Sequence, residues 1–424
     1  MSSAPWVSHT DLALRLEGVV LTCWLLLATL AVSNTKFIWL LPVPWALLLL
    51  RWQASRSNLL AVARHWPIPL LASVVLAVWL VLGAAFGAPA LHSRLTLAAI
   101  ALLWLPVAAL IVGQRRAGRS IEWPLAAALL AVVVLNMVRV GHQLYGGSAR
   151  PWGYTHNVLL GALMAAYALV ATSLLLRSSH PRRIAYAGLG LGLALAIALA
   201  SQARTPLVAG AMTLIVIALA WRPRFSRTVW AVLAAGVAIW AVATSQRWQL
   251  LIEQTLKYET ATHKSSIGAR IDMLRWAALH VREIPAFGFG ESGLAEHMNQ
   301  RYVEFAVDPG KIYRLIHMHN DILQLSFAHG LVAGVGYIVM LAAVIIGLYR
   351  QRRSMGGFDP VAVLGSAGAA AAVLLLAIAG LFDCFLYWPK VWVAMQAVLA
   401  IALALHGSDT NAARPALTRG GPAI

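Results

Sequence analysis

Residues 67–87 read PIPLLASVVLAVWLVLGAAFG and contain no charged side chain. A helix of about 20 apolar residues crosses the roughly 30 Å hydrocarbon core of a bilayer, so this stretch predicts a transmembrane helix. Similar stretches lie on both sides of it along the chain. Together they predict about twelve transmembrane helices, at residues 15–33, 36–50, 67–87, 93–113, 122–139, 157–177, 183–201, 205–221, 227–244, 320–349, 361–381 and 388–406.

The composition of the whole chain supports an all-α polytopic membrane protein. Of its 424 residues, 60% are hydrophobic and 11% are charged, too few charged residues to cover the surface of a soluble domain. The formal net charge of +18 would suit a nucleic-acid-binding protein. However, Lys and Arg stand mostly in short groups between the apolar stretches, which is typical of membrane orientation. We therefore expect membrane lipids, and no nucleic acid, around this chain.

The arginine groups follow every second predicted helix. Because basic loops stay in the cytoplasm, this alternation places both termini there and the remaining loops outside. The first apolar stretch has no small-residue cleavage site after it and is expected to remain as a helix. The two cysteines, Cys23 and Cys384, are too few for a disulfide framework. The basic groups are Arg51, Arg56 and Arg64; Arg115, Arg116 and Arg119; Arg177, Arg182 and Arg183; Arg222, Arg224 and Arg227; and Arg350, Arg352 and Arg353.

The predicted helices divide the chain into four parts. Residues 1–244 hold the first nine transmembrane helices, residues 320–406 hold the last three, and residues 407–424 form a short cytoplasmic tail. Residues 245–319 form one large external loop, which carries about half of the 15 acidic residues of the chain. Ile267, Ile271 and Leu274 recur in this loop at helical spacing. The loop is therefore predicted to be helical and to cap the outer face of the bundle.

Three polar groups stand where polar side chains are costly, and such positions are where chemistry is expected. The first is Arg204 in the outer turn Ser201–Pro206, an arginine that either reaches the lipid headgroups or grips a phosphate with two hydrogen bonds. The second is Arg270 on the apolar face of the loop helix, between Ile267 and Leu274. This arginine either pairs with an acid or points at a ligand.

The third polar group begins the tenth predicted helix, where residues 317–324 read HMHNDILQ. A helix N-terminus favours the neutral imidazole, the form that a general base needs, so His319 is the candidate catalytic residue. His317 and Asn320 are secondary candidates beside it. A metal site through His317 and His319 has little support, since residues two apart do not share a helix face. Further external candidates are Arg139, His156 and Arg314.

These residues resemble the O-antigen ligase and polymerase superfamily, whose members are polytopic glycosyltransferases. The resemblance covers about residues 200–340 and rests on three signatures in the family's order. They are Gln202-Ala203-Arg204-Thr205; Arg270 with Trp276 and the run Pro285, Gly288-Phe289-Gly290; and His319-Asn320-Asp321-Ile322-Leu323-Gln324 with Gly330. The first 200 residues contribute only their hydropathy.

The resemblance implies a fold of the all-helical membrane glycosyltransferase kind (GT-C-like), with a periplasmic helical loop over the active site. It implies a bacterial inner-membrane enzyme of lipopolysaccharide biosynthesis. The donor would be a glycan on undecaprenyl diphosphate and the acceptor a sugar hydroxyl of the lipid A–core oligosaccharide. His319 would be the base, and Arg204 and Arg270 would hold the diphosphate. No cofactor and no metal are expected, because the external loops show no carboxylate cluster at metal-ligand spacing.

Three alternatives remain open from the sequence. An O-antigen polymerase uses a second lipid-linked glycan as its acceptor, and a protein O-oligosaccharyltransferase uses a Ser or Thr hydroxyl. The ligase is favoured, since the chain has no soluble domain after its last predicted helix. A lipid or polysaccharide transporter belongs to another class, and it usually carries charged residues or helix breaks at mid-membrane and an internal repeat. Transport would largely survive the loss of His319.

Overall fold

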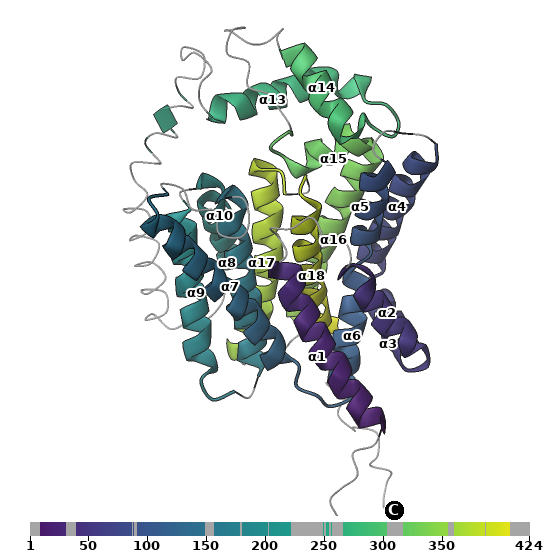
Figure 1. Ribbon diagram of the computed structural model, residues 1–424, viewed down its shortest axis with the longest axis vertical. Coiled ribbons are helices and arrows are strands. Elements are labelled where there is room, and N and C mark those ends of the chain that lie inside the picture. Colours follow the sequence, from purple (N-terminus) through teal and green to yellow (C-terminus); the bar gives the residue numbers. More distant parts are fainter. Residues whose placement is uncertain are drawn as a thin grey trace, which may run out of the picture.

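The computed structural model is built from helices, with no strand in its described part (Figure 1). That part comprises residues 9–30, 40–86, 88, 91–148, 157–178, 180–201, 203–221, 249, 252–253, 256, 266–302, 317–354, 360–385 and 387–407. Its elements are α1 (His9–Leu30), α2 (Pro42–Leu50), α3 (Trp52–His65), α4 (Pro67–Ala85), α5 (Leu91–Ala101), α6 (Trp104–Arg116), α7 (Glu122–Tyr145), α8 (Asn157–Arg177), α9 (Arg183–Ala200), α10 (Arg204–Trp221), α13 (Ser266–His280), the 3₁₀ turn η3 (Val281–Glu283), α14 (Gly290–Tyr302), α15 (Asp321–His329), α16 (Leu331–Ser354), α17 (Pro360–Phe382) and α18 (Pro389–Gly407).

The helices form a bundle with an apolar interior and an apolar exterior. At its centre α8 packs against α7, α9 and α17, and Leu163 and Tyr167 on it have no exposed surface. The outer helix α4 buries Leu76 and Leu80 completely but leaves Leu71 64% and Val78 50% exposed. Such an exposed apolar face is costly in water and stable in lipid. Seven helices are long and apolar enough to cross a membrane among the described residues, which confirms an all-α polytopic membrane protein.

The expected number of about twelve membrane helices is not confirmed. The short second stretch, residues 36–50, yields α2, whose nine residues span only about 14 Å at the helical rise of 1.5 Å per residue. The stretch at residues 93–113 lies within one of the seven candidate spans, Leu91–Arg116, in which a turn at residues 102–103 separates α5 from α6. Residues 227–244, predicted as the ninth helix, lie outside the described residues.

The tenth predicted helix, residues 320–349, is not a single helix. It breaks at Gly330 into the short α15 and the long α16. Gly330 has φ +93°, and a Cβ atom at this position would overlap the carbonyl oxygen of Ala286. Only glycine combines that backbone conformation with so close an approach of another chain segment. The apolar span proper begins after this break, at Leu331.

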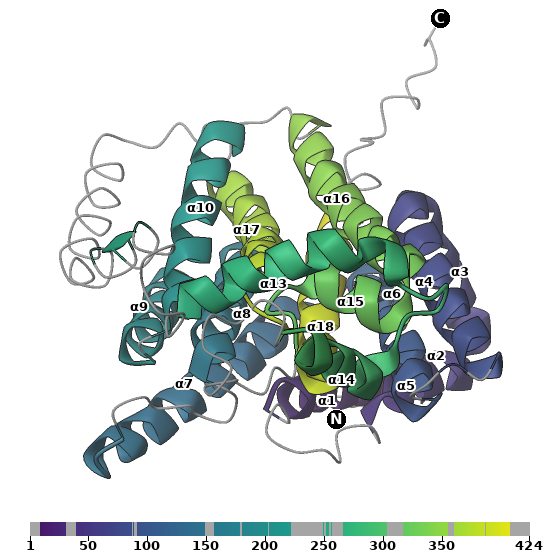
Figure 2. The same cartoon turned by 90° about the horizontal axis from the view of Figure 1, so that it is seen from above.

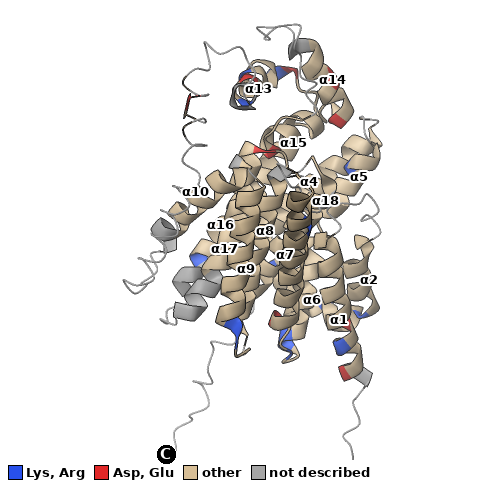
Figure 3. Ribbon diagram, turned by 60° about the vertical axis from the view of Figure 1, so that its left-hand side comes forward, with Lys and Arg blue, Asp and Glu red and all other residues tan. Residues whose placement is uncertain are grey.

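One end of the bundle collects the basic loops (Figure 3). Arg51 binds Glu17 at 2.6 Å, and Arg119 pairs with Asp11 near the start of α1. Arg177 donates to the carbonyl oxygen of Leu405 at 2.8 Å, which brings the end of α18 to the same place. Described members of three of the groups that alternate along the sequence therefore meet at one end, as positive-inside orientation requires. That this end faces the cytoplasm stays a prediction.

A helical cap lies at the opposite end of the bundle. Residues 266–302, called the lid here, comprise α13, η3 and α14 (Figure 1). Seen from above, α13 crosses the end of the bundle, and α14 packs on α15 (Figure 2). An apolar cluster fastens the lid to α15, with its lid members listed first: Met273, Trp276, Ala277, Leu294 and Met298, then Met318, Phe327 and Ala328. The remainder of the expected loop, residues 245–265 and 303–316, lies almost wholly outside the described part.

Candidate functional site

The segment that carries the candidate base is held between the lid and α17. Met318 is 2% exposed within the lid cluster, and its backbone N–H donates to the side chain of Gln324 at 3.0 Å. Asn320 is the N-cap of α15, where its side-chain oxygen accepts the N–H of Leu323 at 3.0 Å. Its amide nitrogen donates to the carbonyl oxygen of Leu381 at 3.0 Å. Asn320 therefore positions its neighbour His319 by fixing where α15 begins.

His319 lies in a backbone conformation that L-residues rarely adopt. Its φ of +47° is the only positive φ at a residue other than glycine in the described part of the chain. Such a conformation costs of the order of 1–3 kcal/mol and persists only where its surroundings fix it. Here Met318 is buried on one side and Asn320 caps α15 on the other. The imidazole is 33% exposed, and its Nδ1 lies 3.2 Å from Oδ1 of Asp383.

Asp383 was not singled out from the sequence. It follows α17 directly, its side chain is 7% exposed, and it accepts the backbone N–H of Cys384 at 2.8 Å. Burial alone would raise the pKa of the Asp383 carboxyl. The hydrogen bond and charge of His319, the Cys384 N–H and the charge of Arg270 outweigh burial and hold that pKa below its usual range. The feature of the sequence that could have pointed to Asp383 is an acidic residue at the end of an apolar stretch.

Arg270 reaches the same place from the lid. Its Nε donates to the carbonyl oxygen of Phe382 at 3.0 Å, one of the carbonyls that a helix end leaves without an intrahelical partner. Its charge acts on Asp383, the next residue along the chain. The structure thus brings together two of the residues predicted from sequence, His319 and Arg270, although 49 positions separate them.

His317 lies beside His319, with 4.2 Å between the ring centroids, and 5.1 Å from the ring of Tyr387. Its Nδ1 accepts the backbone N–H of His319 at 3.3 Å. His317, His319 and Asp383 offer ligand atoms within 4.8 Å of one another. Two imidazoles and a carboxylate are a donor set that zinc accepts. The sequence argument against a metal here assumed that both histidines lie on one helix, whereas both precede α15. Metal independence stays a prediction.

The remaining predicted residues are less closely placed. Arg204 is the first residue of α10, which packs on α8 and α17. Since α9 leaves the basic end at Arg183, α10 starts at the end of the bundle that the lid covers. Arg139 is an exposed residue of the second half of α7. His156 and Arg314 lie outside the described residues.

Two glycine-bearing segments interlock where the lid meets the end of α15. Gly288 has φ +73°, and a Cβ atom there would lie 2.5 Å from the backbone nitrogen of His329. The backbone of Gly330 meets Ala286 in the same way. The N–H of Phe289 donates to the carbonyl oxygen of Phe327 at 2.9 Å. The glycines that stood out in the sequence are therefore explained by close backbone contact, which holds the lid above His319.

Side-chain donors from α4 and α5 complete this contact. Arg94, with no exposed surface, donates to the carbonyl oxygens of Phe287 at 2.6 Å and Ala328 at 3.2 Å. The indole of Trp79 donates to the carbonyl oxygen of His329 at 2.9 Å. Sequence reasoning missed both residues, because Arg94 and Trp79 stand in apolar stretches far from the lid along the chain. The feature of the sequence that could have pointed to Arg94 is an arginine inside an apolar stretch.

Comparison with known proteins gives a family match for part of the chain. Residues 189–338 match the family described as O-antigen ligase, and no curated protein matches the chain. The matched segment includes Arg204, the lid with Arg270, and His317–Asn320, whereas Asp383 lies beyond it. The resemblance seen in the sequence is thereby confirmed over this segment, and the match supports an O-antigen ligase superfamily assignment.

Proposed function

We propose that this chain is an O-antigen ligase, which transfers a preassembled glycan from undecaprenyl diphosphate to a sugar hydroxyl of the lipid A–core oligosaccharide. The observation that carries the proposal is the group formed by His319, Asp383 and the lid residue Arg270. The site faces the periplasm of a bacterial inner membrane, because the arginine-rich loops lie at the other end of the bundle.

His319 acts as the general base. An ionised carboxylate only accepts hydrogen bonds, so the bond to Asp383 places the proton of a neutral imidazole on Nδ1. Nε2 is then the basic nitrogen. It takes the proton from the acceptor hydroxyl as the oxygen attacks the anomeric carbon of the donor glycan. General-base assistance of this kind is typically worth about 100- to 10000-fold in rate.

The arginines serve the leaving group. As the new bond forms, the bond between the anomeric carbon and the diphosphate oxygen breaks, and the anomeric configuration inverts. Undecaprenyl diphosphate leaves with the electron pair, and Arg270 and Arg204 stabilise its growing negative charge. Fixed donors aimed at a developing charge typically contribute about 100- to 1000-fold each. The bond to Phe382 holds Arg270 in place before the reaction begins.

With two arginines on the diphosphate, the reaction proceeds without a divalent metal on the leaving group. Mg²⁺ prefers oxygen ligands and substrate phosphates. Activity that a chelator abolishes and Mg²⁺ restores would therefore contradict this part of the mechanism.

The test uses purified protein, a polyprenyl-diphosphate-linked glycan and rough lipopolysaccharide, followed on a gel. Wild type is expected to shift the lipopolysaccharide to a slower band, and His319→Ala to leave it in place. His92→Ala is the control, because His92 is an exposed histidine at the start of α5. If wild type lengthens the lipid-linked glycan and leaves the lipopolysaccharide unchanged, the enzyme is a polymerase. If no glycan leaves the lipid, the proposal fails.

A further inference from the structure

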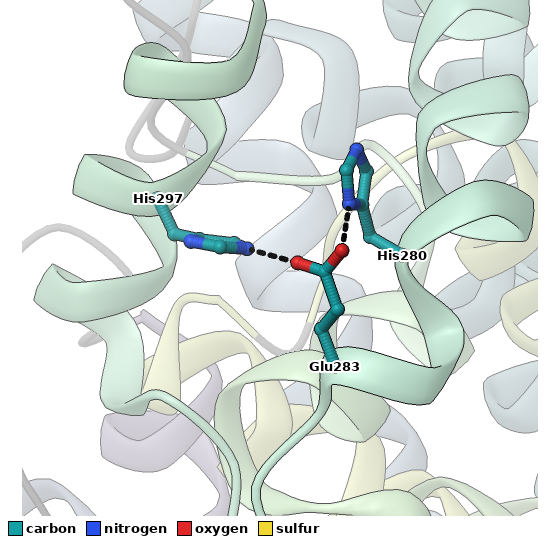
Figure 4. A group of neighbouring side chains, drawn as sticks. All are labelled: His280, Glu283 and His297. Atoms are coloured by element: carbon teal, nitrogen blue, oxygen red, sulfur yellow. Dashed lines mark hydrogen bonds and ion pairs between the residues drawn. The ribbon is translucent and has the colours of Figure 1, made fainter.

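A second group of metal-ligand side chains lies within the lid, apart from His319. It consists of His280 at the end of α13, Glu283 in η3 and His297 in α14 (Figure 4). The carboxylate of Glu283 lies between the two imidazoles. Its Oε1 is 2.9 Å from Nδ1 of His280, and its Oε2 is 3.5 Å from Nε2 of His297. We propose that these three residues bind a zinc ion that clamps α13 to α14.

The distances suit a tetrahedral ion. With zinc bonds of about 2.0–2.2 Å, two ligand atoms of a tetrahedral site lie roughly 3.4 Å apart. The two imidazole–carboxylate separations of 2.9 and 3.5 Å bracket that value. All three residues offer a ligand atom within 4.8 Å of the others. The two separations involve different oxygens of Glu283, so rotation of its side chain would bring one oxygen to the ion.

The imidazoles are held by aromatic packing and not by the carboxylate alone. Trp276 lies 4.9 Å from His280 and 5.7 Å from His297 between ring centroids, and Phe289 stacks on His297 at 4.4 Å. His280 is 9% and His297 19% exposed, whereas Glu283 is 42% exposed. Two rings fixed by their neighbours, with a carboxylate on the solvent side, give a preorganised site that an ion enters from water.

The donor set selects the metal. Two imidazoles and one carboxylate are ligands that zinc takes in sites whose fourth position holds water, whereas Mg²⁺ and Ca²⁺ require oxygen ligands. The ion would join the two lid helices next to the apolar cluster that contains Trp276 and Met318. Met318 precedes His319, and Arg270 lies on α13. Zinc would thus stabilise the helix that carries Arg270 and the packing that holds the segment of His319.

The experiment measures zinc directly, on the full-length chain in detergent. Protein stripped with a chelator is titrated with ZnCl₂ alone, and zinc content, thermal unfolding and hydrogen–deuterium exchange are recorded. Wild type is expected to bind one zinc in the lid, to unfold at a higher temperature with zinc and to exchange more slowly over residues 266–302. His297→Ala and Glu283→Gln are expected to weaken binding by at least about 100-fold, because even loss of an outer-shell partner costs about 10- to 100-fold.

His317→Ala is the decisive comparison, since His317, His319 and Asp383 form the other group able to hold a metal. The proposal requires that His317→Ala keep the lid-bound zinc and its thermal shift. If His317→Ala loses the zinc and His297→Ala keeps it, the metal belongs to the His319 site. If wild type retains no zinc above a detergent blank, the carboxylate only bridges two imidazoles by hydrogen bonds. Either result overturns the proposal, and neither depends on transfer activity.

Discussion

Replacing Asp383 by asparagine tests the link between α17 and the proposed base. Asn has the same shape, and its side-chain oxygen still accepts the N–H of Cys384 and the proton on Nδ1 of His319. What the variant removes is the negative charge. That charge matters most once His319 has taken the acceptor proton and become an imidazolium. The loss should therefore appear in kcat, with little change in KM.

The magnitude follows from the geometry. A hydrogen bond to a charged group contributes about 1.5–3 kcal/mol. The Nδ1–Oδ1 distance of 3.2 Å is long, and His319 is 33% exposed, which places this bond in the lower half of that range. About 1.5–2 kcal/mol corresponds to roughly a 10- to 30-fold decrease in kcat. Asp383→Ala, which also removes the acceptor for the imidazole and the Cys384 N–H, should cost more.

The assay is the time course of glycan transfer to rough lipopolysaccharide at saturating donor, with thermal unfolding measured in parallel. Glu122→Gln is the matched control, because Glu122 is a buried carboxylate that binds Arg115 at 3.0 Å at the basic end of the bundle. It should leave kcat unchanged. The reasoning is refuted if Asp383→Asn retains more than about a third of wild-type kcat while folded.

Two further changes test the lid and the arginine. Gly288→Ala should loosen the lid and lower both the unfolding temperature and the activity, since the left-handed backbone alone costs about 1–2 kcal/mol and the new Cβ would lie 2.5 Å from backbone atoms of Ala328 and His329. Gly293→Ala is its control, because there the added Cβ meets only the Phe289 side chain at 3.6 Å; equal unfolding temperatures for the two variants would contradict the interlocking. Arg270→Lys keeps the charge but loses the planar donor group, so kcat/KM for the donor should fall by about 100- to 1000-fold. A decrease of less than threefold in the same transfer assay would mean that charge alone suffices.

The sequence predicted the membrane helices well where hydropathy alone decides them. The match is close for α4, α8 and α9, whose ends agree within two residues with the expected ranges. The prediction of helix ends from hydropathy failed where a contact with a distant part of the chain is involved. At Gly330 the chain meets the carbonyl oxygen of Ala286, a lid residue distant in the sequence, and α15 ends.

The candidate site was predicted in part, for a related reason. His319 and Arg270 were recognised because their residue types are costly in their surroundings. Asp383 was not, since its role depends on a contact with a residue 64 positions earlier in the chain. The positive φ of His319 also has no local signal, because neighbours distant in sequence impose it. The lid group of His280, Glu283 and His297 was missed because its spacing looks like an ordinary solvated helix pair.

Three consecutive residues at the end of α17 organise the site. The carbonyl oxygens of Leu381 and Phe382 accept hydrogen bonds from Asn320 and Arg270, and the Asp383 carboxylate binds His319. A helix C-terminus carries partial negative charge, and Asp383 adds a full one. This end therefore stabilises an imidazolium but would repel a diphosphate. Arg270 bonds to this same helix end, so its charge offsets that repulsion as well as binding the leaving group. Loss of Arg270 should accordingly weaken binding of the diphosphate donor as well as slow its departure.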